Sequence, residues 1–317
     1  MTDTEIAIYS QVSNTKKSRN GLIDLYRFLL SLVVVKSHSL FILNGPYFGP
    51  GRACVEFFFV LSGYLFWSFL NKSKDRSIKE SIIQLHKTRF IPLAIPLCIG
   101  VVSNLIESIA TEKLNMWGYL WYIEVMFIEM IVLILLRKFI KDDKKFILTI
   151  TVIMLVTLIL KFFGPFYTWG FFRGASSIPI GIILASLPKV KKKWISILCL
   201  IPAAIGCFTM VCFEWSNVDW FGYRIPELIL DVVLYPALIY FTFCLEFKSR
   251  LFSYLGSLSF GLYAFQCLAD MLRTFGVSNV RFLFGLILFA TIIEDGGKRL
   301  YRYMRKKHLS TVQSTES

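Results

Sequence analysis

The sequence predicts an all-α, polytopic membrane protein with about ten transmembrane helices in one bundle and both termini in the cytoplasm. Hydrophobic residues make up 56% of the 317 residues, and the mean hydropathy is +0.61. Charged residues reach only 18%, below the ~25% typical of soluble domains. The apolar runs last about twenty residues and do not alternate with polar ones, which favours membrane helices over the strands of a barrel.

Ten apolar runs define a predicted membrane domain at residues 21–294, between a polar N-terminal segment at 1–20 and a basic, then Ser/Thr-rich tail at 295–317. Both flanking segments are expected in the cytoplasm. The predicted spans are 21–43, 53–70, 90–110, 117–136, 146–163, 170–187, 194–213, 226–245, 251–272 and 280–294.

The distribution of Lys and Arg supports this count. With the N-terminus inside, 26 of the 35 basic residues fall in predicted cytoplasmic segments and 5 in outer segments, as the positive-inside rule requires. The net charge of +14 therefore indicates a multi-pass protein of the cell membrane, in contact with its lipids, and no nucleic-acid partner. The seven cysteines lie in or beside apolar runs without zinc-ligand spacing, so no metal site is expected.

The first span contains unusual charges for its depth, among them Asp24, Arg27 and His38. Arg27 and His38 are eleven residues apart, which is three helical turns plus roughly 20°, so they share one helix face about 16 Å apart. Ionisable groups at membrane depth are functional-site hypotheses by default. Two alternatives stay open: Arg27 forms an i,i+3 ion pair with Asp24, and His38 is a histidine hydrogen-bonded within the bundle.

The second span carries Glu56 about one turn from its outer end, at a depth similar to that of His38. The short connection between the two spans makes them antiparallel neighbours, so we expect Glu56 to reach His38. A carboxylate beside an imidazole orients it and stabilises its protonated form, which suits a general base acting on a hydroxyl. The alternative is a half-exposed charge at the outer interface.

These residues belong to a set of motifs that resembles the integral-membrane acyltransferase 3 family. Arg27-x10-His38 is followed by Glu56-Phe-Phe-Phe-Val-Leu-Ser-Gly63, and the combination of the two motifs is specific. The resemblance runs from about residue 20 to residue 266. It includes Arg89-Phe-Ile-Pro92, Leu120-Trp-Tyr122 and the segment from Tyr254 to Tyr263.

The resemblance implies an O-acyltransferase that moves an acyl group, usually acetyl, from acetyl-CoA to a hydroxyl of an extracytoplasmic carbohydrate such as an exopolysaccharide, a capsule or an O-antigen. Of the donor-binding residues that this implies, Lys87 and Arg89 would bind the phosphates of the donor, and Arg27 would guide its thioester arm inward. His38 would act as general base or carry the acyl group briefly, with Glu56 and Arg27 beside it in the catalytic set. Gln266 stands where the family usually has a late histidine.

Other predicted intramembrane charges favour a structural role. Arg173 is expected to form an ion pair with Glu124, Glu129 or Asp231, and the two glutamates do not share a helix face. A transporter of a sugar-linked or small anionic substrate is the alternative function, although no matching pair of Gly/Pro-interrupted spans points to inverted repeats. A membrane sensor has little support, because the sequence shows no soluble effector domain.

Overall fold

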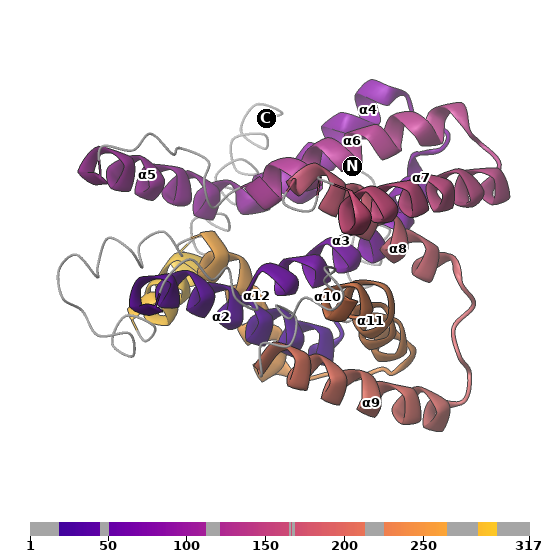
Figure 1. The fold of residues 1–317 in the computed structure, drawn as a ribbon. Helices are drawn as coiled ribbons and strands as arrows, with labels where there is room; N and C mark the ends of the chain where they lie inside the picture. Colours follow the sequence, from indigo (N-terminus) through magenta and orange to yellow (C-terminus); the bar gives the residue numbers. More distant parts are fainter. Residues whose placement is uncertain are drawn as a thin grey trace, which may run out of the picture.

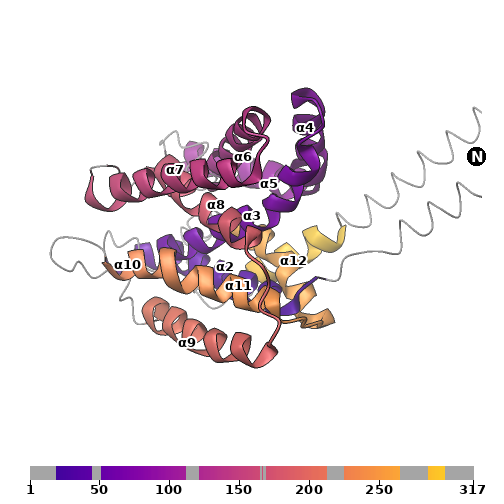
Figure 2. The ribbon, with the colours of Figure 1, turned by 90° about the vertical axis from the view of Figure 1, so that its right-hand side faces the viewer.

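A computed structural model describes residues 19–44, 51–111, 121–164, 166, 169–212, 225–264 and 285–296. Within these residues the chain forms helices and no strands, and the longer helices lie side by side in one bundle (Figures 1 and 2). The all-α prediction is confirmed for this part of the chain.

The helices follow the predicted spans closely. They are α2 (Gly21–Asn44), α3 (Gly51–Ser73), α4 (Ile78–Leu85), α5 (Ala94–Thr111), α6 (Trp121–Phe139), α7 (Asp143–Phe163), α8 (Gly170–Ser186), α9 (Lys193–Cys212), α10 (Ile225–Ile229), α11 (Tyr235–Cys244) and α12 (Arg250–Ala264), with a further helix at 285–296. A helix occupies most of the described residues in every predicted span.

Four of the described helices are long and apolar enough to cross a membrane: Gly51–Ser73, Asp143–Phe163, Lys193–Val211 and Ile225–Cys244. A fifth span results if Ile78–Phe90 and Ala94–Val102, which are bent by 70° relative to each other, cross as one broken helix. These helices and the overall composition indicate a membrane protein. The count of ten spans and the cytoplasmic position of both termini stay predictions.

Helix α3 lies inside the bundle, with α6 and α7 on one side and α9 and α11 on the other (Figures 1 and 2). Its residues enter two separate apolar cores, since Phe59 and Phe66 pack with α6 while Phe57 and Val60 pack with α9 and α11. A helix that is buried on two sides can bring polar side chains from several neighbours together.

Close packing of α3 against α8 depends on glycine. A Cβ atom at Gly63 would overlap the backbone carbonyl of Ile178, and one at Gly181 would overlap the carbonyl of Val60. Small residues that let two backbones approach are a common device of membrane helix pairs. The approach brings the first half of α3 within side-chain reach of Arg173 and Ser177 on α8.

Two spans contain a π-helical turn that ends two residues before a proline. One is η1 (His86–Phe90), which leads through a short 3-10 segment, η2 (Ile91–Leu93), into α5, and the other is η4 (Leu230–Leu234), which joins α10 to α11. Pro92 and Pro236 cannot donate a backbone hydrogen bond, and their rings crowd the preceding turn. Widened turns of this kind are frequent at functional sites, and each here carries charged residues discussed below.

Candidate functional site

The carboxylate of Glu56 is the centre of a buried polar network in the bundle. Its Oε1 accepts hydrogen bonds from Lys161 Nζ at 2.9 Å and from Arg173 Nε at 2.6 Å. Its Oε2 accepts one from Ser177 Oγ at 2.6 Å. We call Glu56, Lys161, Arg173, Ser177 and Asp231 the Glu56 network. Its first four members come from α3, α7 and α8, so the network joins three helices.

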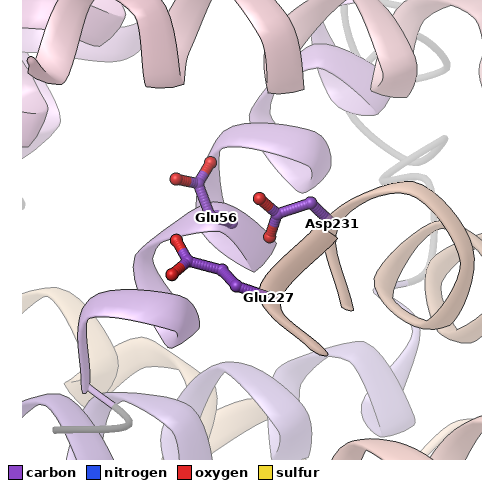
Figure 3. Close-up of side chains that lie close together, drawn as sticks. All are labelled: Glu56, Glu227 and Asp231. Carbon is purple, nitrogen blue, oxygen red and sulfur yellow. The ribbon is translucent and has the colours of Figure 1, made fainter. Parts of the chain in front are cut away.

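Lys161 extends the network to a fourth helical segment. Its ammonium also donates to Asp231 Oδ2 at 2.7 Å, and the Lys161 and Asp231 side chains are both 0% exposed. Glu227, about one helical turn before Asp231, presents a third buried carboxylate. Carboxylate oxygens of Glu56, Glu227 and Asp231 lie within 4.8 Å of one another, and the three side chains lie close together in Figure 3. The ammonium of Lys161 occupies the position among Glu56 and Asp231 that a bound cation would take.

Arg173 joins the network to the beginning of α3. Its Nη2 donates to the backbone carbonyl of Arg52 at 2.6 Å, while its guanidinium lies 5.0 Å from the ring centroid of Trp121. The first gives Arg173 a second charge-assisted hydrogen bond, and the second is a cation–π contact. Arg173 therefore ties the predicted outer ends of α3, α6 and α8 together.

The structure corrects two expectations about these charges. The alternative in which Glu56 is half exposed at the outer interface is wrong, because its side chain is 0% exposed. Arg173 does form a buried ion pair, as expected, but with Glu56 rather than with Glu124, Glu129 or Asp231. Sequence spacing could not reveal this pairing, since Glu56 and Arg173 are separated by 117 residues.

The predicted contact between Glu56 and His38 stays a prediction. The backbone of His38 continues the α2 helix that begins at Gly21, so Arg27 and His38 belong to one helix as expected. The side chain of His38 lies outside the described part of the structure. An ionised carboxylate offers about four acceptor positions. Three donors among the described residues bind Glu56, which leaves one position for a further partner such as His38.

A second polar group lies toward the predicted cytoplasmic ends of the helices. Arg27 donates to Asp24 Oδ1 at 3.1 Å, which confirms the i,i+3 ion pair, and Arg19 donates to the same oxygen at 3.0 Å. Arg89, in the π-helical turn η1, donates to the backbone carbonyl of Leu65 on α3 at 3.2 Å. We call Arg19, Arg27 and Arg89 the inner arginine cluster.

Arg27 and Arg89 come from distant parts of the chain but converge on one region. The charge of each guanidinium lies close enough to the buried Tyr122 hydroxyl to interact with it electrostatically. The charges of Arg89 and Arg27 interact with each other in the same way. Bringing like charges together is unfavourable without an anion. Among the described residues, the Asp24 carboxylate is shared by Arg19 and Arg27, while Arg89 binds a backbone carbonyl. Positive charge therefore predominates in this part of the described structure.

Lys87 is the remaining residue that was predicted to bind the acyl-CoA donor. It is exposed and lies in the same π-helical turn as Arg89. Four of the predicted site residues have described side chains. Arg27 and Arg89 approach each other, and Lys87 lies two residues before Arg89 in the chain. Glu56 belongs to the separate Glu56 network. The two groups are linked through α3.

Sequence reasoning missed several members of both groups. Lys161 was not singled out from the sequence, although a lysine at membrane depth is itself a signal of a buried partner. Ser177 carried no recognisable signal, whereas Ser62 lies within the Glu56–Gly63 motif, from which no role for it was inferred. Tyr122 had been noticed as part of a motif, but not as the neighbour of two arginines.

Comparison with protein families matches residues 20–293 to the acyltransferase domain of the acyltransferase 3 family. No curated protein and no solved structure matches the chain. The family match covers every helix described above up to residue 293, including the Glu56 network and, of the inner arginine cluster, Arg27 and Arg89. This chain therefore belongs to the membrane acyltransferase 3 family.

Proposed function

We propose that the protein is a membrane O-acyltransferase that transfers an acyl group, most simply acetyl, from cytoplasmic acyl-CoA to a hydroxyl of a surface or lipid-linked carbohydrate. Family membership over residues 20–293 supports acyl transfer in general. The inner arginine cluster is the observation that carries the choice of donor, because its excess positive charge suits a ligand rich in phosphate groups.

In this proposal Arg27 and Arg89, with Lys87 at the cytoplasmic side, bind the phosphates of the donor. His38 lies three turns further along α2, about 16 Å from Arg27 along the helix axis. That separation suits a long, flexible arm that carries the reactive thioester away from its phosphates. The donor and acceptor would then meet near the predicted outer half of the bundle.

The chemistry at His38 balances in either of two routes. In the direct route, the imidazole takes the proton of the acceptor hydroxyl as its oxygen attacks the thioester carbonyl, and the proton then passes to the leaving thiolate. In the covalent route, an imidazole nitrogen displaces the thiol and carries the acyl group until the acceptor hydroxyl attacks it. Both routes yield one ester and one free thiol.

The test is transfer of labelled acetyl from acetyl-CoA to surface carbohydrate in membranes that contain the protein. We expect transfer by wild type and a loss of about 10²–10⁴-fold in His38→Ala, the usual contribution of a general base. His308→Ala, in the predicted tail, is the matched control and should retain activity. Wild-type transfer by a folded His38→Ala variant would overturn the role of His38. Substrate flux without acyl-CoA would favour the transporter alternative instead.

A further inference from the structure

A partly buried pair of hydroxyl groups lies between the inner arginine cluster and the Glu56 network. Ser62 Oγ of α3 and Tyr122 Oη of α6 are 3.1 Å apart, and either oxygen is able to donate. Ser62 stands at the midpoint of the 23-residue helix α3, at the level of the middle of a membrane span. Ser62 Oγ also lies 3.4 Å from the sulfur of Met126.

Along α3, the hydroxyl pair lies next to the position where Arg89 binds. Arg89 binds the carbonyl of Leu65, three residues from Ser62, which places both contacts on neighbouring turns of the same helix face. Arg27 and Arg89 are electrostatic neighbours of the Tyr122 hydroxyl. In the other direction, Glu56 is six residues from Ser62, a rise of about 9 Å. The hydroxyl pair thus lies between the predicted phosphate-binding end and the predicted reacting end.

The aromatic surroundings fix the orientation of Tyr122. Its ring centroid lies 4.6 Å from that of Phe59 and 5.6 Å from that of Tyr263, and the residue is 8% exposed. Ser62 is only partly buried, and the Arg27 side chain is 27% exposed despite its depth in the predicted span. Ser62 on α3 and Arg27 on α2 thus each keep some exposed surface on the two sides of the Tyr122 hydroxyl.

We propose that the Ser62–Tyr122 pair binds the amide-bearing pantetheine arm of the acyl-CoA donor on its way from the inner arginine cluster to His38. This inference rests on the proposed function and adds two binding residues to it. An amide carried into an apolar bundle is destabilised unless it finds a hydrogen-bond partner there. Hydroxyl groups both donate and accept, so the pair satisfies an amide N–H or carbonyl at this depth.

The alternative role is purely structural, because the same hydrogen bond holds α3 against α6. Two probes separate the roles: CoA, which contains the arm, and adenosine 3′,5′-bisphosphate, which contains phosphates but no arm. We expect Tyr122→Phe and Ser62→Ala to weaken CoA binding about tenfold, the effect of one hydrogen bond. Binding of the bisphosphate, measured on the same purified proteins, should stay at the wild-type value.

Tyr64→Phe is the matched control, since it also removes a tyrosine hydroxyl. Tyr64 lies on α3, two residues from Ser62, but its ring stacks on Phe243. It should bind both probes as wild type does. Unchanged CoA binding in Tyr122→Phe and Ser62→Ala, with wild type still transferring acetyl, would overturn this inference and leave the proposed function standing. Equal weakening for both probes would also overturn it, because a general disturbance of the bundle does not distinguish the arm. Failure of wild type to bind either probe would overturn the inference and the proposed donor together.

Discussion

Replacing Lys161 with methionine removes the ammonium that binds both Glu56 and Asp231 while keeping a long, unbranched side chain. The Lys161, Glu56 and Asp231 side chains are all 0% exposed, so water cannot take over the lost contacts. Glu56 keeps its bonds from Arg173 and Ser177. Asp231 loses the 2.7 Å bond to its Oδ2, and its Oδ1 has no hydrogen-bond partner in the described residues.

The magnitude follows from the two bonds that are lost. A hydrogen bond to a charged group contributes about 1.5–3 kcal/mol, and two of them give roughly 3–6 kcal/mol. Removing one partner of a buried ion pair costs about 3–5 kcal/mol in other proteins, which agrees. We therefore expect Lys161→Met to lower the free energy of unfolding by about 3–5 kcal/mol.

The assay is unfolding of purified protein in one detergent or lipid nanodisc, with Lys144→Met as control. Lys144 lies in the first turn of the same helix and is exposed, so its loss should cost less than about 0.5 kcal/mol. The double variant Lys161→Met/Asp231→Leu should be less destabilised than Lys161→Met alone, because no uncompensated Asp231 carboxylate remains. The reasoning is refuted if Lys161→Met resembles Lys144→Met, or if the two substitutions simply add.

Two further substitutions test packing and burial, each against a matched control measured by the same unfolding assay. Gly63→Ala should destabilise the protein by about 1–3 kcal/mol, because the added Cβ would meet the Ile178 backbone. In the control Gly285→Ala, the added Cβ meets nothing within 4 Å, so this change should be neutral or slightly stabilising. Equal effects of the two substitutions would contradict the close α3–α8 contact. Glu129→Leu should stabilise by about 1–3 kcal/mol, since the buried Glu129 Oε1 has no hydrogen-bond partner in the described residues, while Glu124→Leu at an exposed position of the same helix should change little. A large loss of stability in Glu129→Leu would indicate that its carboxyl has a partner.

Helix positions were predictable because each depends on a local run of apolar residues. The run at 226–245 became the continuous helical stretch Ile225–Cys244, with only the π-helical turn before Pro236 unforeseen. The Asp24–Arg27 ion pair was predictable for the same reason, since three residues of helix bring the two side chains together.

The partners of the buried charges were not predictable from local pattern. Lys161 is 105 residues from Glu56 and 70 from Asp231 along the chain. Which helices become neighbours depends on close approaches such as that of Gly63 to α8, and a single sequence does not specify these. The same holds for Ser62 and Tyr122, whose hydroxyl groups meet only because α3 packs against α6.

The central claim is that acyl groups pass from a donor on one side of the membrane to an acceptor on the other. The most direct measurement uses sealed proteoliposomes. They enclose the surface carbohydrate that serves as acceptor in the membrane assay, and labelled acetyl-CoA is added outside. The account predicts labelled ester on the enclosed carbohydrate with wild type, and none with His38→Ala or with protein-free vesicles. Label that appears only when donor and acceptor share one compartment would contradict it.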